Sequence, residues 1–476
     1  MIREYFIQAV YLAASVLFIL GLKSLTSPDR AQRGMQQAAV GMLLAVVGTL
    51  VHQDIITYGW IAGGLLLGTA IGYPLGMFVP MTAMPQRIAF SHMFGALAAT
   101  LVGVAEYHHG SHGVVRGLLA LLPGAAAEIG RPKMAALGFE VLFGALTVTG
   151  SFMAFGKLQG FITGRPVTYR GQNVMNLALF AAAVGGLLYL VYDPSSAVVF
   201  YGMIVVALAI GVLMVLPIGG ADMPVVVSLL NSYAGLAASA TGFAIGNNVL
   251  IICGALDGAS GFLLSVLMSK AMNRSFTNVL FGAFGGETAA ASGGKSAAGL
   301  TVQSVTPEDA ALRLAYARSV IIVPGYGMAV AQSQHQVREL AELIEKKGGE
   351  VKYAIHPVAG RMPGHMNVLL AEANVPYDRL YDMEEINDQF EQADVALVIG
   401  ANDVVNPAAR TDPSSPIYGM PILNADRARS VIVLKRSMAS GFAGIENELF
   451  YDGKTSMLFG DAKKSLTQLV SEVKNV

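Results

Sequence analysis

Nine long apolar runs fill the first 270 residues, and they constrain the fold more than any other feature of the chain. Each run is long enough to cross a hydrocarbon core of about 30 Å, which takes about 20 helical residues. Only 13% of the residues are charged, against about 25% in a typical soluble domain. The sequence therefore predicts a polytopic α-helical membrane domain. Its candidate spans are 5–22, 35–51, 55–79, 84–105, 135–155, 173–191, 197–216, 223–245 and 249–268.

Basic residues between the spans predict the orientation, because cytoplasmic loops carry an excess of Lys and Arg. With nine spans, the two ends lie on opposite sides of the membrane. A cytoplasmic C-terminal part gives these inner basic residues: Lys23, Arg30, Arg33, Arg87, Lys157, Arg165, Arg170, Lys270 and Arg274. The outer segments would then hold only Arg3, Arg116, Arg131 and Lys133. This excess predicts a multi-pass protein whose C-terminal part is cytoplasmic.

The composition changes after about residue 282, where Lys, Arg, Asp and Glu become frequent. We predict a transmembrane domain over residues 1–275, a Gly/Ala/Ser-rich linker over 276–305 and a soluble domain over 306–476. Strand-like runs at 319–323, 351–355, 394–399 and 430–434 alternate with helical patterns, the first over about 329–346. This alternation predicts an α/β Rossmann-like domain with a parallel sheet.

A glycine-containing turn follows the first predicted strand of the soluble domain. It reads Gly325-Tyr326-Gly327-Met328-Ala329-Val330 and leads into a helical pattern. In dinucleotide-binding domains such a turn presents free amides and a helix N-terminus to a pyrophosphate. The third glycine of that fingerprint is replaced by Val330, so the motif alone is equally compatible with a structural turn. Its position between a strand and a helix favours the binding function.

The ends of two other strands indicate which dinucleotide is bound. An NAD-binding unit usually ends its second strand with Asp or Glu, which binds the ribose 2′-hydroxyl. Here His356 and Pro357 follow that strand, whereas Lys435 and Arg436 follow the strand at 430–434. Two cations at the carboxyl end of a strand suit a 2′-phosphate. The alternative is an exposed basic pair without a ligand.

Two further loops follow strands, and both would converge on the same edge of the sheet. The loop at 356–364 carries several glycines and one cation, and the loop at 400–407 offers a carboxylate and two amides. Either loop could instead be turn chemistry alone. Their candidate cofactor-binding residues are Val358, Ala359, Gly360, Arg361, Met362, Pro363, Gly400, Asn402 and Asp403.

Polar residues inside the membrane spans are the second group of candidates, because they are costly in lipid and commonly functional. His92 lies near the middle of the fourth span, and a histidine pKa near neutrality suits a proton relay. Asn231 lies in the eighth span, Glu140 in the fifth and Asp257 in the ninth. We interpret the cluster of His108, His109 and His112 as a solvated loop and predict no metal site. The net charge of −1 indicates no nucleic-acid partner.

These motifs are similar to those of a known family across nearly the whole chain. The soluble part resembles the NADP-binding domain III of proton-translocating NAD(P) transhydrogenase, and the whole chain resembles the bacterial beta subunit. The matching strings are GYGMAVAQSQHQV from Gly325, HPVAGRMPGHMNVLLAEA from His356, GANDVVNPAA from Gly400, VLKRSMASGFAG from Val433, GGADMPVVVSLLNSYAG from Gly219 and SKAMNRSF from Ser269.

The resemblance implies roles for individual residues. Residues 325–330 would lie at the NADP pyrophosphate, and Lys435 and Arg436 would hold the 2′-phosphate. Arg361 and Asp403 would lie in loops over the nucleotide, with Asp403 linking its redox state to proton movement. His92 and Asn231 would lie on the proton path. Phe442 departs from the family, in which many relatives carry Tyr in the lid over NADP.

The same resemblance implies the reaction and the partners. A Si-specific transhydrogenase would transfer hydride from NADH to NADP⁺ and couple it to inward proton flow across the bacterial inner membrane. This chain would bind NADP(H), and NAD(H) would be bound by a separate alpha subunit, with a homodimer of alpha–beta units in the lipid bilayer.

Two functions of other classes remain open from the residues alone. The chain could be an ion or solute transporter with a regulatory nucleotide-binding domain, or a membrane dehydrogenase that reduces quinone. A quinone-reducing dehydrogenase would need a flavin, haem or iron–sulfur site. The single cysteine, Cys253, cannot by itself hold an iron–sulfur cluster.

Overall fold

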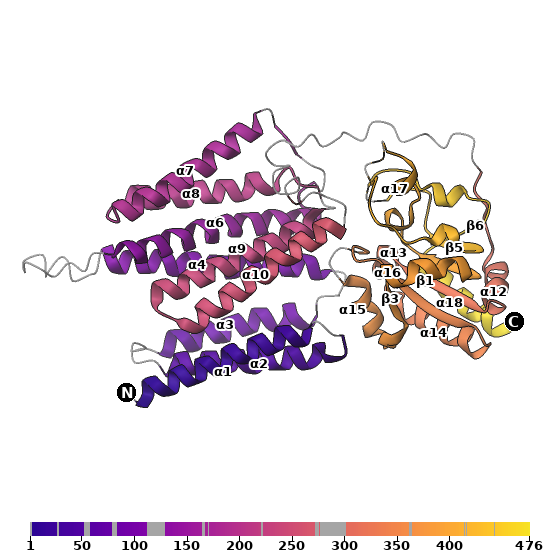
Figure 1. The fold of residues 1–476 in the computed structure, drawn as a ribbon, viewed down its shortest axis with the longest axis horizontal. Coiled ribbons are helices and arrows are strands. Elements are labelled where there is room, and N and C mark those ends of the chain that lie inside the picture. Colours follow the sequence, from indigo (N-terminus) through magenta and orange to yellow (C-terminus); the bar gives the residue numbers. More distant parts are fainter. Residues whose placement is uncertain are drawn as a thin grey trace, which may run out of the picture. The chain divides into compact units, whose positions relative to one another are not determined.

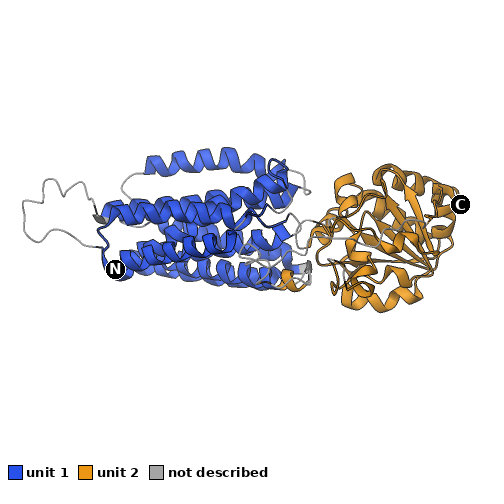
Figure 2. Cartoon of the chain, turned by 90° about the horizontal axis from the view of Figure 1, so that it is seen from above, with its two compact units in different colours: residues 1–266, 277–286 blue, residues 267–276, 287–476 orange. Residues whose placement is uncertain are grey.

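The structure of the chain is a computed structural model that contains two compact units, drawn in separate colours in Figure 2. Unit 1 comprises residues 1–266 and 277–286, and unit 2 comprises 267–276 and 287–476. The described residues are 2–25, 28–51, 58–78, 83–111, 129–163, 167–169, 171–219, 222–271, 276, 301–360, 364–413, 415, 417–441 and 443–476. Most of the predicted linker, residues 277–300, lies outside them, and the predicted domain bounds stay a prediction.

Nine long helices make up the described N-terminal part, and each coincides with one predicted span (Figure 1). They are α1 (Ile2–Leu25), α2 (Pro28–Leu50), α3 (Tyr58–Met77), α4 (Met84–Ser111), α6 (Arg131–Gln159), α7 (Gln172–Tyr192), α8 (Ala197–Val215), α9 (Met223–Ile245) and α10 (Asn248–Ala271). Eight of the described helices are long and apolar enough to cross a membrane. The exception is α2, which carries Arg30, Arg33 and three glutamines in its first half. The prediction of a polytopic helical membrane domain is confirmed.

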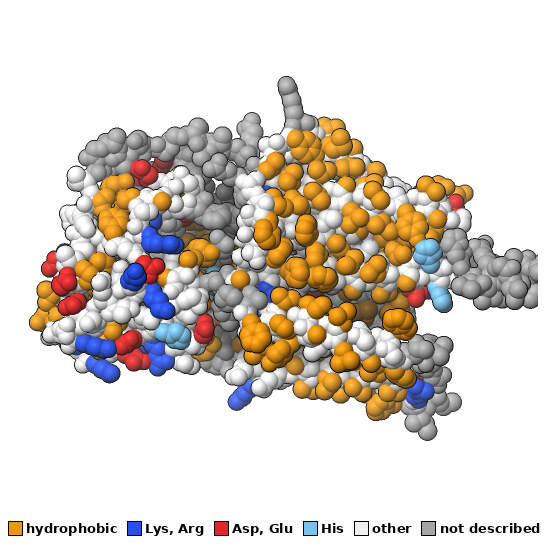
Figure 3. Space-filling view, turned by 180° about the vertical axis from the view of Figure 1, so that it is seen from behind, with side chains coloured by type: hydrophobic (Ala, Val, Ile, Leu, Met, Phe, Trp, Pro, Cys, Tyr) orange, Lys and Arg blue, Asp and Glu red, His pale blue; other side chains and the backbone are white. Residues whose placement is uncertain are grey.

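The outward surface of these helices is apolar, as lipid requires (Figure 3). Trp60 of α3 has 87% of its surface exposed, and none of the residues of α3 is buried. Large exposed apolar side chains also line α1, α7 and α10. A soluble protein rarely exposes so many. The chain is therefore a membrane protein.

Helices α9 and α10 pack with their backbones in contact, and small residues make this possible. A Cβ atom at Gly254 would lie 2.4 Å from the backbone nitrogen of Ser239, and one at Gly235 would lie 2.5 Å from that of Gly258. The hydroxyl of Ser232 donates to the carbonyl of Gly258 at 2.7 Å. Association inside a bilayer depends on such close packing, because lipid is as apolar as the helix surface.

One buried cation closes the end of another helix in unit 1. Lys157 near the end of α6 is 5% exposed, and its ammonium donates to the carbonyls of Leu216 and Ile218 at 2.5 and 2.7 Å. These carbonyls follow α8, where the helix dipole is negative. The lysine therefore satisfies backbone groups that lipid could not satisfy.

Unit 2 contains a six-stranded parallel sheet in the order β3-β2-β1-β4-β5-β6 (Figure 1). The strands are β1 (Ser319–Pro324), β2 (Glu350–Ile355), β3 (Leu380–Asp382), β4 (Val395–Ile399), β5 (Ser430–Lys435) and β6 (Thr455–Phe459). In this doubly wound order the direction of winding changes between β1 and β4, and ligands bind at that point. The predicted Rossmann-like parallel sheet is confirmed.

Helices cover the sheet and complete the core. They are α12 (Pro307–Ala315), α13 (Tyr326–Ala331), α14 (Gln334–Lys346), α15 (His365–Glu372), α16 (Met383–Ile386), α17 (Ala408–Thr411) and α18 (Ala462–Asn475). α14 packs on β2 and on α18, which also contacts β5. Alternate residues of β1, β4 and β5, such as Ile321, Val398 and Val433, form a buried cluster with Phe390 and Phe450. The strands are thus fixed by apolar contacts, and their carboxyl ends carry the loops.

The helix predicted over residues 329–346 is interrupted in the structure. The helical pattern over 329–346 is two helices, α13 and α14, separated by Gln332 in the left-handed conformation (φ 50°) and by Ser333. Ser333 is fully buried, and its hydroxyl bonds back to the carbonyl of Met328. Such a side chain competes with the helical hydrogen bond and ends α13 early.

Replacing Gly254 with Ala should separate α9 from α10, because the added methyl would overlap backbone atoms that cannot rotate away. The expected loss is about 2 kcal/mol, the scale of overpacking a close-packed core. Gly185→Ala in α7, where no atom lies within 4 Å of the new methyl, is the matched control. Thermal unfolding of the purified chain in detergent measures both, and equal midpoints would contradict the contact.

Candidate functional site

The turn after β1 touches the turn after β4, and glycines allow it. The amide of Gly325 donates to the carbonyl of Ile399 at 2.9 Å, and that of Gly327 donates to Gly400 at 3.0 Å. A Cβ atom at Gly325 would lie 2.3 Å from the nitrogen of Ala401, and one at Gly327 would lie 2.6 Å from the Cα of Gly400. These predicted site residues therefore meet at the point where the winding of the sheet changes.

The other members of the predicted glycine turn differ in what they can offer a ligand. Met328 and Ala329 are fully buried, so their side chains belong to the core, and only their backbone faces the turn. Val330 has 43% of its surface exposed. The ring of Tyr326 is half-buried and lies 6.4 Å from the ring of His365, measured between centroids. A ligand at this turn would thus meet the backbone and the side chains of Tyr326 and Val330, and not those of Met328 and Ala329.

Asp403 joins the loop after β4 to the segment after β5. It is the first residue of the 3₁₀ helix η6 (Asp403–Val405), and its carboxylate accepts a hydrogen bond from the amide of Ala443 at 2.9 Å. A Cβ atom at Gly441 would lie 2.4 Å from the Asn402 amide nitrogen and 2.5 Å from Asp403 Oδ1. The two loops therefore pack as one body over the carboxyl ends of β4 and β5. Phe442, between these residues, lies outside the described chain.

Asn447 strengthens the same junction, and the sequence analysis did not single it out. It is 2% exposed, and its amide donates to the carbonyl and to the side-chain oxygen of Asn402, both at 3.0 Å. The fully buried Asn406 likewise donates to the carbonyl of Glu446 at 3.0 Å. In the sequence, the only sign of this junction is two asparagines next to turns, and this pattern is also common in loops that have no function.

Lys435 ends β5 and points into this loop assembly. Its ammonium donates to the carbonyl of Ala439 at 2.5 Å and lies 4.7 Å from the centroid of the Phe450 ring. Partial burial lowers the pKa of Lys435, and the nearby charge of Asp403 opposes that shift. The adjacent Arg436 is exposed. The two residues of the predicted basic pair therefore differ: Lys435 is held by the loops around it, whereas the guanidinium of Arg436 is accessible to an anion in solution.

The loop after β2 is fixed by a buried histidine. His356 is 1% exposed, its Nε2 lies 2.8 Å from the carbonyl oxygen of Pro421, and its Nδ1 accepts from the amide of Val358 at 3.2 Å. Burial lowers the pKa of His356 to about 4, so the ring is neutral near pH 7 and donates to Pro421. Ala359 is buried beside it, and Gly360 has φ 103°, where a side chain would be strained. Arg361, Met362 and Pro363 lie outside the described residues.

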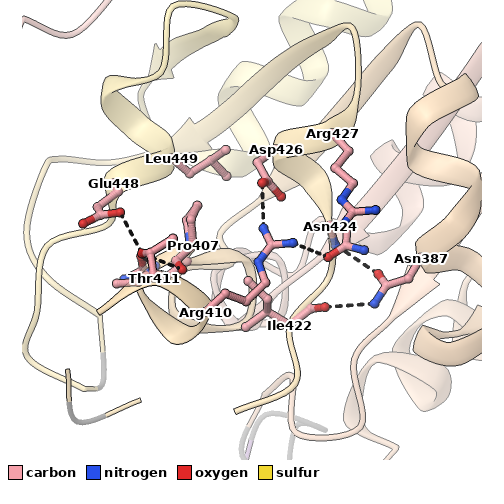
Figure 4. A network of polar contacts seen from close by, with 12 residues as sticks. Asn387, Pro407, Arg410, Thr411, Ile422, Asn424, Asp426, Arg427, Glu448 and Leu449 are labelled. Carbon is pink, nitrogen blue, oxygen red and sulfur yellow. Dashed lines mark hydrogen bonds and ion pairs between the residues drawn. The ribbon is translucent and has the colours of Figure 1, made fainter. Parts of the chain in front are cut away.

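A polar network holds the far end of the β4 loop (Figure 4). The guanidinium of Arg410 in α17 donates to Asn424 at 2.8 Å and to Asp426 at 2.6 Å. The hydroxyl of Thr411 donates to Glu448 at 3.4 Å, so the same helix also reaches the segment after residue 447. These contacts fix the far end of the loop that carries Asp403.

In the membrane unit, His92 and Asn231 come from adjacent helices, α4 and α9. The amide of Asn231 donates to Oδ1 of Asp257 on α10 at 3.0 Å. His92 is half-buried, and no described residue hydrogen-bonds its buried Nδ1. The carboxylate of Asp257 acts electrostatically on His92 at longer range, and no hydrogen bond joins these two described side chains. The direct hydrogen-bond partner of Asn231 in the structure is thus Asp257, which the sequence analysis left without a role.

Membrane-length helices and a doubly wound sheet with a glycine-lined switch point define the class: an integral membrane protein with a Rossmann-like domain. Comparison with known proteins narrows this class. The family described as NAD(P) transhydrogenase beta subunit matches residues 7–472. The chain is 50% identical over 464 residues to the NAD(P) transhydrogenase subunit beta of Rhodospirillum rubrum, which covers 97% of this chain and 98% of that protein. The protein of the same name from one strain of that species matches equally. This chain therefore belongs to the NAD(P) transhydrogenase beta subunit family.

The buried His356 predicts a specific dependence of stability on pH. Its pKa is about 4 in the folded protein and 6.5 when unfolded, so the unfolded state binds more protons between these values. Stability of unit 2 should therefore fall as the pH drops from 6.5 to 4, by about 3 kcal/mol from this residue. Denaturant unfolding of residues 301–476 at several pH values measures it. His356→Gln should flatten this part of the profile, while His335→Gln, at an exposed position, should keep it; parallel profiles in all three proteins would contradict the assignment.

Proposed function

We propose that this chain binds NADP(H) at the carboxyl ends of β1, β4 and β5, and that NADP⁺ receives hydride there from NADH held by a separate alpha subunit. The observation that carries the proposal is the basic pair, Lys435 and Arg436, at the end of β5, on the edge of the sheet where the glycine turns meet. The reaction is of the Si-specific, proton-translocating type. Membership of the family supports the enzyme class and the need for an alpha partner.

The residues present fit this nucleotide. Close contact between the glycine turns at Gly325 and Gly400 would let a pyrophosphate approach the backbone at the start of α13. Lys435 and Arg436 suit a 2′-phosphate. The position at the end of β2 that would bind a 2′-hydroxyl through an acid holds His356, which is neutral. Val358, Ala359, Gly360, Arg361, Met362, Pro363, Asn402 and Asp403 complete the proposed binding loops.

The nicotinamide supplies the hydride chemistry, and the protein supplies position and gating. Asp403 bonds to the segment over the site through Ala443, so a change in that carboxylate would alter how the segment closes. We assign Asp403 to the link between nucleotide state and proton movement, and His92 and Asn231 to the proton path. The proposed setting is the bacterial inner membrane, with unit 2 cytoplasmic and two alpha–beta units in a homodimer.

Arg436→Ala and Lys435→Ala should each weaken NADP binding by about 1.5–3 kcal/mol, the scale of a hydrogen bond to a charged group. NAD binding should change little, because NAD has no 2′-phosphate. Titration calorimetry of both nucleotides with the purified chain measures the difference. Lys346→Ala, an exposed cation in the last turn of α14 just before β2 begins, is the control. Equal losses for both nucleotides would remove the basic pair from the 2′-phosphate site.

The whole reaction is tested with inverted bacterial membrane vesicles that contain this chain. With the alpha subunit present, external NADH should reduce external NADP⁺, and a pH-sensitive dye should report coupled proton movement. The chain without the alpha subunit should bind NADP(H) but not oxidise NADH. Right-side-out vesicles should be inactive with external nucleotides, because unit 2 would face the interior. Rapid NADH oxidation by the chain alone would refute the proposal, and a regulated transporter would move its solute without any hydride transfer.

A further inference from the structure

A single carboxylate interrupts the apolar part of α10. Asp257 lies several turns from either end of this helix, and the only other charged residue of the helix is Lys270 in its last turn. An acidic residue at such a depth is costly, and in membrane proteins it commonly lies on an ion or proton pathway. Asp257 therefore requires either a partner or a function.

The structure gives Asp257 a partner on the neighbouring helix. Asn231 on α9 donates to its Oδ1 at 3.0 Å. The contact lies on the tight seam between α9 and α10, where Ser228 donates to the carbonyl of Gly261 at 2.9 Å. A Cβ atom at Gly261 would lie 3.0 Å from the Asn231 amide nitrogen, so the glycine leaves room for this amide. Asn231 is thereby held in place against the carboxyl group.

Two titratable side chains lie within electrostatic reach of Asp257. One is His92, on α4, and the other is Cys253, one turn earlier on α10 itself. His92 keeps its buried Nδ1 without a hydrogen-bond partner among the described residues. An acid on α10 and a base on α4 thus interact electrostatically, and α9, which contacts α4, supplies an amide that cannot titrate as the partner of the acid.

Asp257 is also reachable from outside the described bundle. Its side chain is exposed, whereas Glu140 on α6 is fully buried. If Asp257 only accepted the bond from Asn231, an uncharged amide would do the same at a lower cost in lipid. Asp257 can titrate, its side chain is exposed, and a base, His92, interacts with it electrostatically. These properties suit a residue that takes up and passes on protons.

Resting on the proton translocation proposed above, we infer that Asp257 is a further proton-carrying residue of the membrane path and exchanges its proton with His92. The transfer passes through water, because no hydrogen bond joins the two side chains: the O–H bond of the Asp257 carboxyl breaks, and an N–H bond forms on the imidazole of His92. A carboxylate and an imidazolium then stand near each other. The reverse transfer restores two neutral groups, and Asn231 is a positioning residue that orients the carboxyl.

Asp257→Asn tests this role with little change in shape. Asparagine can still accept the bond from Asn231 but cannot carry a proton. With the alpha subunit in sealed vesicles, proton translocation should fall by about 100-fold, within the range for removing an acid–base group. NADP(H) binding should stay unchanged. Asp257→Glu should restore translocation to within about tenfold of the wild type, since it returns the acid.

The matched control is Ser260→Ala, one turn further along α10, at an exposed position whose hydroxyl donates to the Asp257 carbonyl at 3.0 Å. It should translocate protons like the wild type. A second readout does not depend on activity: dicyclohexylcarbodiimide, an apolar reagent for protonated carboxyls, should label Asp257 in the intact complex, as detected by mass spectrometry. Full translocation by Asp257→Asn, or no labelling at Asp257, would overturn the inference. Hydride transfer without proton movement in the wild type would overturn the proposed function itself, and this inference with it.

Discussion

The contact between two backbones at the switch point is the constraint on which the site in unit 2 depends. Because Gly325 and Gly327 bond directly to residues 399 and 400, the turns after β1 and β4 leave the sheet together. Asp403 lies three residues after Gly400, so its position depends on where this turn leaves the sheet. Asp403 and Asn402 then hold the segment after β5 through Ala443 and Asn447. One close approach thus sets the geometry of three loops.

The membrane unit solves a different problem with similar means. Its helices must satisfy polar groups without water, and they do so by approaching closely enough for side chains to bond to the backbone of a neighbour. Ser228 and Ser232 bond to carbonyls of α10, and Thr149 of α6 bonds to the carbonyl of Leu208 in α8 at 2.7 Å. The glycines allow two helices to come close together, and the serine and threonine hydroxyls then bond to carbonyls of the neighbouring helix. In both units, small residues mark the places where function is proposed.

Much of the fold could be predicted from the sequence, because hydrophobic periodicity decides it. Four of the six strands were predicted within one residue, and most spans within a few residues, although α2 begins seven residues before its predicted span. The two missed strands lie at the edges of the sheet, where the signal is weak: β3 has three residues and is only partly buried, and β6 begins with Thr455 and Ser456. The break between α13 and α14 depends on the buried hydroxyl of Ser333, which no periodicity reveals.

The candidate site was predictable in its motifs but not in its contacts. Glycines after strands and the pair at 435–436 are local patterns, so their place on the sheet edge could be anticipated. Asn447 and Asn406 act across about 40 residues of sequence, and their role depends on tertiary packing. The same is true of the bond from Asn231 to Asp257. These hydrogen-bond partners are brought together only when two distant elements pack in the folded protein, so no local sequence pattern predicts them.

The buried ammonium of Lys157 has a consequence for how the protein is made. Its acceptors, the carbonyls of Leu216 and Ile218, are synthesised about sixty residues later. Until they emerge, the cation must stay in contact with water or lipid headgroups, because an unpaired charge in the bilayer is costly. The contact that buries this ammonium can therefore form only after α8 is complete. The end of α6 is thus packed against the rest of unit 1 only once the segment after α8 has been synthesised.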